Sequence, residues 1–483
     1  MRDERKVIRL VDTASPRTTS QTMFTALKRA VIRLGLYARG TIGDAARAVA
    51  DACGARPEAG RLSTSETKQA LYDPSQVSMS FADLPLYRGI LKHKEIGRLF
   101  DIEDPFYRCH EARQGVTTQI AGQRYVNFAS YDYLGLNQHP AVVDAAKRAI
   151  DSLGTSVSAS RIVAGERTMH GELERAVAGF YGVEAAIAFV SGHATNVSTI
   201  STLMTPDDLI LYDELSHNSL LVGTKLSGAT AYAFTHNDAD ALEALLQKHR
   251  RFHKRALIVA EGLYSMDGDV GDLPAFVALK EKYGAWLMID EAHALGVLGA
   301  TGRGSAEHFG IDPARIDIWM GTLSKALASC GGYIAGKREL IDVLKYQAPG
   351  LVYSVGLSPP LTAAAAASLE LLKAEPERVA RLQANGKLFL SLARAAGMDT
   401  ATSEGFAVVS VIVGDLVNAG RLADRMLARG LNVLPIIYPA VPIKAARLRF
   451  FITSEHTPTQ IREAVRTMRE ELDGLGKRQK RAA

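Results

Sequence analysis

The sequence predicts an α/β protein whose main body is a largely parallel β-sheet covered on both faces by helices. Between residues 140 and 350, helical patterns alternate with short apolar runs. The runs are apolar throughout rather than at every second position, which is typical of parallel strands buried on both faces. The expected strands span residues 186–190, 209–212, 256–260, 285–290, 316–320 and 333–335.

The pattern changes after residue 360, where an alanine-rich helical stretch is followed by apolar runs interleaved with helices. This change predicts a smaller α+β domain, with strands at 407–413, 431–437 and 448–452. The predicted organisation is an N-terminal extension (1–80), a lead-in segment (81–135), a large domain (136–360), the C-terminal α+β domain (361–475) and a basic tail (476–483).

The N-terminal extension contains the pattern of a basic amphipathic helix over residues 24–34. Such a helix fits packing on the catalytic core or on a second copy of the chain. It fits equally the docking of an anionic membrane surface or of an acidic carrier protein. The apolar positions are Phe24, Leu27, Val31 and Leu34, and the basic positions are Lys28, Arg29 and Arg33.

The composition fits an ordinary globular enzyme. The 483 residues are 47% hydrophobic, enough for a large core, and the formal charge of +5 gives no argument for nucleic-acid binding. Three cysteines without paired spacing support neither a disulfide framework nor a metal site. No apolar run approaches the roughly 20 residues of a membrane span, and no signal peptide is evident. We therefore expect a cytoplasmic protein, peripheral at the inner face of the membrane if the N-terminal helix binds lipid.

Lys325 is the first candidate catalytic residue. It follows the apolar run 316–320 and a small hydroxyl turn, so its amine is expected at a strand end, where open α/β sheets bind ligands. An amine there can form a Schiff base with a carbonyl cofactor, and the flanking hydroxyls of Thr322 and Ser324 suit a phosphate. The pattern favours pyridoxal phosphate (PLP), although a surface lysine after a strand would look the same.

Asp290 ends the apolar run 285–290 and is followed three residues later by His293. A buried carboxylate is costly without a cation, and the protonated nitrogen of a pyridine ring would serve as one. His293 could donate a hydrogen bond to the phenolic oxygen of such a cofactor. The alternative is that Asp290 only caps the segment that follows.

Two further loops follow predicted strands. Gly192 and His193 lie where a strand enters a helix, a geometry whose free N–H groups bind phosphate, although a lone Ser-Gly pair is also an ordinary turn. His217 follows the strand at 209–212 and could stack on a planar cofactor ring. A histidine in such a loop is equally compatible with a purely structural role.

Two arginines of the C-terminal domain, Arg447 and Arg449, share one face of the strand expected in the stretch 446–452. Arginine binds carboxylates through two parallel hydrogen bonds, so one of them is a candidate for holding an amino-acid substrate. Paired surface charges on an edge strand are the alternative.

These motifs, in this order, resemble the PLP-dependent α-oxoamine synthase family of fold type I. The resemblance covers residues 82–475 and implies a seven-stranded, mainly parallel sheet in the large domain. The motifs are Ser130–Leu136, Ser158–Arg161, His170–Glu174, Ser191–Asn196, Ser216–His217, Glu261–Gly268, Asp290–His293, Gly321–Lys325, and Arg449 with His456–Thr457.

The resemblance implies a role for each candidate. Lys325 would hold PLP and act as base and acid at the substrate Cα, while Asp290 pairs with the pyridine nitrogen and His293 with the phenolic oxygen. His217 would stack on the ring and polarise a thioester carbonyl. Contacts to the phosphate are implied for Gly192, His193, Thr322 and Ser324, and contacts to the substrate for Arg449, Tyr131, Asp132 and Ser265.

The resemblance also implies a homodimer with shared active sites. Residues 352–357 match the segment that contacts the phosphate across the subunit interface. Relatives commonly carry Ser or Thr where this chain has Val355 or Gly356, so we expect a contact through the backbone.

Three details resemble the serine palmitoyltransferase branch of the family: Tyr131, the loop 438–442 and residues 455–457, although Asp132 replaces the Asn of that branch. This implies condensation of L-serine with a long-chain acyl thioester of CoA or of acyl carrier protein. The alternative is another branch, such as 8-amino-7-oxononanoate synthase, 2-amino-3-ketobutyrate ligase or a secondary-metabolite enzyme. Other rivals are a PLP aminotransferase, a membrane scaffold and a catalytically inactive partner subunit, the last opposed by the presence of Lys325, Asp290 and His217.

Overall fold

The computed structural model describes residues 77–482, with side chains described as far as Leu475. Residues 105–474 form one compact unit; residues 77–104 and the end of the chain from Leu475 belong to another. The expected basic helix at 24–34 lies outside the described residues. None of the described helices combines the length and the apolar composition that a bilayer crossing requires.

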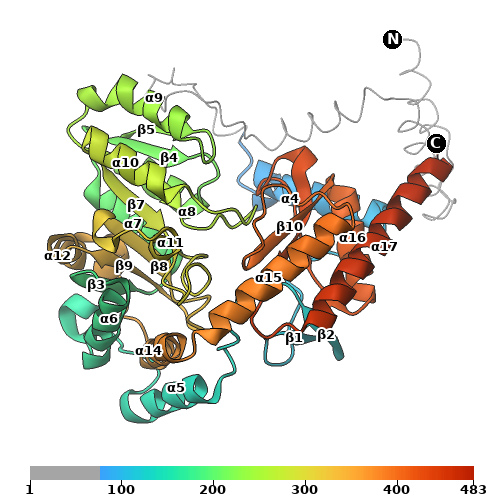
Figure 1. Ribbon diagram of the computed structural model, residues 1–483, viewed down its shortest axis with the longest axis horizontal. Helices are drawn as coiled ribbons and strands as arrows, with labels where there is room; N and C mark the ends of the chain where they lie inside the picture. Colours follow the sequence, from blue (N-terminus) through green and yellow to red (C-terminus); the bar gives the residue numbers. More distant parts are fainter. Residues whose placement is uncertain (1–76, 483) are drawn as a thin grey trace. The chain divides into compact units, whose positions relative to one another are not determined.

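The large sheet has seven strands in the order β3-β9-β8-β7-β6-β4-β5, as expected (Figure 1). Strand β9 runs antiparallel to both of its neighbours, and the other pairs are parallel. The strands are β3 (Ala185–Phe189), β4 (Leu209–Asp213), β5 (Thr230–Phe234), β6 (Ala256–Glu261), β7 (Trp286–Asp290), β8 (Ile318–Thr322) and β9 (Gly332–Gly336).

All six strands expected in this region are present, and β5 is the one that the apolar runs did not indicate. It lies at the edge of the sheet, and of its five residues only Phe234 is buried. An edge strand with one buried residue has no need of a continuous apolar run, so its sequence carries little signal.

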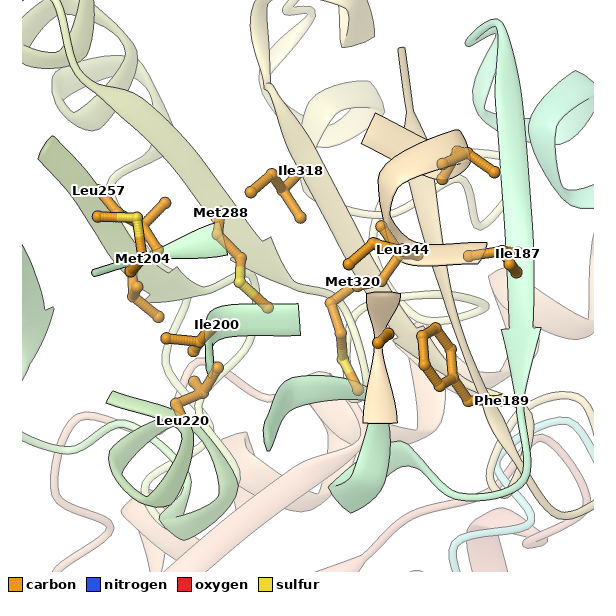
Figure 2. Close-up of a cluster of buried hydrophobic side chains, with 14 of the residues drawn as sticks. Ile187, Phe189, Ile200, Met204, Leu220, Leu257, Met288, Ile318, Met320 and Leu344 are labelled. Carbon is orange, nitrogen blue, oxygen red and sulfur yellow. The ribbon is translucent and has the colours of Figure 1, made fainter. Parts of the chain in front are cut away.

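Helices cover both faces of this sheet. On one face, side chains at alternate strand positions pack against α7 (Gly192–Leu203), α8 (Asn218–Ser227), α12 (Arg338–Gln347) and α13 (Pro349–Val352) (Figure 2). On the other face, Tyr181 of α6 (Thr168–Tyr181) stacks on Trp319 with ring centroids 5.3 Å apart. The buried side chains on the face covered by α7, α8, α12 and α13 include Ile187, Phe189, Ile200, Met204, Leu220, Leu257, Met288, Ile318, Met320 and Leu344.

Two small sheets complete the unit. In one, β2 (Gln123–Asn127) pairs antiparallel with β1 (Thr117–Ile120) and parallel with β11 (Leu431–Asn432). In the other, β13 (Ala446–Phe451) pairs antiparallel with β10 (Val408–Gly414) and β12 (Leu434–Ile436). The expected strand at 431–437 is therefore two strands in different sheets, a division that its apolar sequence does not reveal.

The remaining helices belong to both units. Helix α14, the alanine-rich stretch, packs against α5 and α6 of the region expected to form the large domain. In the other unit, α4 (Pro85–Leu99) is the expected lead-in helix, and the backbone of α17 continues as helix through the expected basic tail to Ala482. Bounds not yet given are α5 (Pro140–Leu153), α9 (Ala239–His249), α10 (Leu273–Tyr283), α11 (Ser305–Phe309), α14 (Pro359–Ala374), α15 (Glu377–Ala395), α16 (Leu416–Ala428) and α17 (Pro458–Ala482).

Candidate active site

The carboxyl ends of four neighbouring parallel strands carry polar residues. Asp213 ends β4, Glu261 ends β6, Asp290 ends β7 and Thr322 ends β8. Because parallel strands end at the same edge of a sheet, these residues lie along one line, with Glu261 paired in register with Asp290. Such an edge is where open α/β sheets bind ligands.

Lys325 lies in the turn after β8, with its Nζ 5.8 Å from the centroid of the Tyr131 ring. Loss of hydration on burial lowers the pKa of its amine to about 8, although the negative charges of Asp290 and Glu261 oppose this shift. The nearby Arg449 guanidinium lowers this pKa further. A large fraction of the amine is therefore neutral near pH 8, which a nucleophilic lysine requires.

Asp290 is 4% exposed and accepts hydrogen bonds from Asn196 Nδ2 and from the Ala292 backbone N–H, both at 2.9 Å. Within residues 77–475, no lysine, arginine or histidine forms an ion pair with it. A buried carboxylate without a cation is unfavourable, so the site suits a ligand that brings a positive charge. A protonated pyridine nitrogen fits this requirement.

His217 is connected to Asp290 through a chain of hydrogen bonds. Asn196 Nδ2 also donates to Ser219 Oγ at 2.9 Å, and that hydroxyl lies 2.6 Å from His217 Nδ1. The Ser219 backbone N–H also donates to Nδ1, so Nδ1 is an acceptor and the ring proton sits on Nε2. The ring therefore presents an N–H donor on its other side.

The protonation of His217 follows from its surroundings. Desolvation lowers the pKa of its ring, Asp290 raises it, and Lys325, His193 and Arg449 lower it again. The backbone N–H of His217 donates to Glu261 Oε1 at 2.6 Å, which fixes the start of α8. The neutral ring can stack on a cofactor or donate to a carbonyl oxygen.

His293 is buried, and its Nδ1 lies 2.7 Å from Tyr133 Oη. Burial holds the pKa of this ring well below its usual value, with further lowering by Lys325, Arg449 and His217. Its other nitrogen remains for a ligand, as the expected contact with a phenolic oxygen requires.

The structure brings two of the four expected phosphate residues directly together. A Cβ added at Gly192 would lie 3.1 Å from Thr322 Oγ1, so glycine here allows β8 to approach the N-terminus of α7 closely. The hydroxyls of Thr322 and Ser324 both donate to the Gly331 carbonyl, at 2.9 and 3.3 Å. His193 is exposed in the first turn of α7. The unpaired N–H groups of that turn form the part of the site suited to an anion.

Of the two arginines on β13, Arg447 is committed to protein contacts. It pairs with Asp267 and donates to the Met266 carbonyl at 3.1 Å. Arg449 Nη1 donates to the Ser265 carbonyl at 2.9 Å, while its buried Nε has no hydrogen-bond partner. Arg449 is thus the arginine with donors left for a substrate carboxylate, and Ser265 acts on it through its backbone.

The structure separates the roles of Tyr131 and Asp132. The ring of Tyr131 is 43% exposed and packs edge-on against Phe451 with centroids 4.8 Å apart, which leaves part of it facing the Lys325 amine. Asp132 Oδ1 instead accepts the backbone N–H groups of Leu136 and Asn137, at 2.8 and 3.2 Å. Its carboxylate closes a turn, so the expected contact of Asp132 with substrate finds no support in this geometry.

Asn196, Ser219, Tyr133 and Glu261 belong to the site, although the sequence suggested no role for them. Asn196 lies four residues after Gly192, so helical spacing could have placed it on the same side of α7. Tyr133 is 160 residues from His293, and no local pattern indicates such a contact.

Comparison with known proteins follows the same line. Residues 123–468 match the family model of aminotransferase class I and II. An 8-amino-7-oxononanoate synthase from Bacillus velezensis is 39% identical over 359 residues, which are 74% of this chain and 91% of that protein.

Solved structures are similar as well. A serine palmitoyltransferase from S. paucimobilis with bound PLP-myriocin is 29% identical with a TM-score of 0.78, covering 81% of this chain and 98% of that one. An 8-amino-7-oxononanoate synthase from Francisella tularensis is 27% identical with a TM-score of 0.63, covering 73% and 98%. These similarities point to the same family as the arrangement of Lys325, Asp290 and the N-terminus of α7. The chain belongs to the PLP-dependent α-oxoamine synthase family, within the aminotransferase class I and II proteins.

Proposed function

We propose that this chain condenses L-serine with a long-chain acyl thioester, with loss of CO2, to give 3-ketodihydrosphingosine. The observation that carries the proposal is the active-site cluster, in which Asn196 and Ser219 link Asp290 to His217 by hydrogen bonds and the charges of Asp290 and Arg449 act on the Lys325 amine. CoA or an acyl carrier protein would carry the acyl group.

Each residue of the site has its own role in the proposed reaction. When bound, PLP supplies an electron sink that stabilises negative charge at the substrate Cα. Arg449 holds the substrate carboxylate, and the neutral amine of Lys325 takes the proton from Cα and later returns one. His217 donates its Nε2–H to the thioester carbonyl, where a new bond to Cα forms as the thiolate leaves. The carboxylate then departs as CO2.

L-Serine is favoured by the structural similarity to a serine palmitoyltransferase, with its TM-score of 0.78 against 0.63 for an 8-amino-7-oxononanoate synthase. Tyr131, exposed beside Lys325, supports the same branch. The second candidate is 8-amino-7-oxononanoate synthase, which the 39% identity to the Bacillus velezensis protein favours.

Spectral titration of the PLP-loaded protein with L-serine, L-alanine, glycine and L-threonine distinguishes these candidates, followed by product mass with palmitoyl-CoA. A response selective for serine and a long-chain 3-keto amine would support the first proposal. A response mainly to alanine, without that product, would overturn it in favour of the second.

Loading of PLP onto the apoprotein should depend on pH through Lys325. Because burial lowers the pKa of this amine to about 8, the amine is protonated below that pH and unreactive toward a carbonyl. We expect the rate of appearance of the yellow PLP band to rise as the pH increases through 8 and then to level off. A rate that rises without levelling up to pH 10 would show that the amine keeps an ordinary pKa.

Substitution of His217 by alanine should impair condensation more than serine binding. Removal of one hydrogen-bond donor to the developing oxyanion is expected to lower kcat about 100-fold. The matched control is His253→Ala. His253 precedes β6, whereas His217 follows the parallel neighbour β4, so the two histidines lie at opposite edges of the sheet. Equal losses in serine affinity and in kcat for His217→Ala would remove its thioester role.

We also propose a homodimer in which residues 352–357 contact the site of the second copy. In that segment Tyr353 is 86% and Val355 52% exposed, which leaves apolar surface for a partner. Sedimentation equilibrium of the loaded protein tests this, and a monomer at micromolar concentration would contradict it.

A further inference from the structure

His236, which follows β5 outside the cluster around Lys325, lies between two buried carboxylates. Its Nδ1 is 2.9 Å from Asp213 Oδ1, and its Nε2 is 2.7 Å from Asp269 Oδ2. Asp213 is fully buried and Asp269 is 5% exposed. Asn237 reinforces the arrangement: its backbone N–H donates to Asp213 Oδ2 and its side chain to Asp269 Oδ2, at 2.9 and 3.2 Å.

The geometry requires a positively charged ring. An ionised carboxylate only accepts hydrogen bonds, so a histidine with a carboxylate at each nitrogen must carry a proton on both. In agreement, the two aspartates raise the pKa of His236 to about 10 against the opposing effect of burial. The imidazolium therefore joins the end of β4, through Asp213, to the turn that contains Asp269.

That turn, residues 264–269, is closed on itself. The Tyr264 N–H donates to the Asp269 carbonyl and the Gly268 N–H to the Tyr264 carbonyl, both at 2.9 Å. Gly268 has φ of +80°, and a Cβ there would lie 2.2 Å from the Val408 carbonyl oxygen. The turn is therefore held in one compact conformation, in which Asp269 is hydrogen-bonded to Tyr264 next to Ser265.

Carbonyl groups inside the turn bind the arginines of β13. The Ser265 carbonyl accepts a hydrogen bond from Arg449 at 2.9 Å, and the Met266 carbonyl accepts one from Arg447 at 3.1 Å. Met266 Sδ also lies 3.3 Å from Arg449 Nη1. The guanidinium assigned to the substrate carboxylate is thus held by the same turn that His236 holds through Asp269.

We propose that His236 is a positioning residue: its ion pairs with Asp213 and Asp269 fix the 264–269 turn, and the turn fixes Arg449 for the substrate carboxylate. This inference rests on the proposed function, because it takes Arg449 as the carboxylate-binding group. It assigns to His236 an effect on carboxylate recognition rather than on the cofactor.

The test compares two ligands of the PLP-loaded protein, L-serine and L-serinamide, which share the amine and differ in the carboxylate. The dissociation constant of L-serinamide divided by that of L-serine, both measured by spectral titration, is a ratio that exceeds one when the carboxylate is recognised and falls toward one when that recognition is lost. Asp269→Asn keeps the side-chain volume while removing the charge that faces His236. We expect it to lower the ratio about tenfold, the lower end of what a charge-assisted hydrogen bond contributes. His236→Gln, the second variant, should act in the same direction.

Two reference variants separate the possible failures. Glu166→Gln weakens the ion pair between the buried Arg161 and the exposed Glu166, 2.6 Å long and outside the turn, so it should lower the melting temperature without changing the ratio. Arg449→Ala should bring the ratio close to one. If Arg449→Ala leaves the ratio unchanged, the proposed role of Arg449 is wrong and the inference falls with it.

If Arg449→Ala collapses the ratio while Asp269→Asn and His236→Gln stay within about twofold of the wild type, a change of less than 0.5 kcal/mol, the positioning role is wrong and the proposed function stands. A loss of ratio in Glu166→Gln as large as in Asp269→Asn would also overturn it, since general destabilisation would then explain both. If His236→Gln does not bind PLP, Asp269→Asn decides alone.

Discussion

Replacing Lys325 by alanine should lower turnover more than about a thousandfold, because one side chain supplies both the covalent link to PLP and the proton transfer at Cα. The yellow absorbance band of the wild type should disappear as well. The near-neutral pKa of this amine, together with its place at the end of β8, is the physical basis for both effects.

The matched control is Lys337→Ala, which removes an exposed lysine just after the neighbouring strand β9. It should keep both the band and the activity. A band that survives in Lys325→Ala and is reducible by borohydride would place the link to PLP on another lysine.

Substitution of Asp290 by asparagine should lower kcat by about two to three orders of magnitude. Removal of one partner of a buried charge pair costs about 3–5 kcal/mol, and each 1.4 kcal/mol corresponds to a factor of ten. Asparagine keeps the shape but cannot hold a proton on a ring nitrogen. The free energy of unfolding of the apoprotein should not fall, because the substitution removes a buried charge that no cation of the described residues pairs with.

Asp317→Asn is the control for this substitution. Asp317 precedes β8, at the opposite end of the strands from Asp290, and it pairs with Lys280 at 2.7 Å. The control should keep kcat and the affinity for PLP measured by equilibrium dialysis. An Asp290→Asn protein with kcat within about threefold of the wild type, a change of less than 1 kcal/mol, would show that Asp290 does not face the cofactor.

The parallel sheet could be predicted because burial on both faces demands continuous apolar strands. The same reasoning explains why β5 was not predicted and why one strand was expected at 431–437 where there are two. The edge strand β5 buries one residue of five, and the single apolar run at 431–437 holds two strands that pair with different sheets. The pairing partners of a strand depend on contacts distant in sequence, which a local pattern does not contain.

The candidate site was predictable where a residue ends a strand. Lys325, Asp290 and His217 all follow apolar runs, and the topology of the sheet then brings them together. Asn196 and Ser219 could not be assigned roles, since their function is to connect Asp290 to His217 across two helices. Asp132 shows the converse, because a carboxylate in a site-like motif serves the backbone of its own turn.

The proposed condensation is tested most directly by measuring the CO2 and the free thiol released in the same reaction of the PLP-loaded protein with L-serine and palmitoyl-CoA. Decarboxylative condensation predicts one CO2 and one thiol per molecule of product. When either L-serine or palmitoyl-CoA is omitted, it predicts release of neither. Release of thiol without CO2, or transfer of the amino group to a keto acid without either, would contradict the proposed reaction.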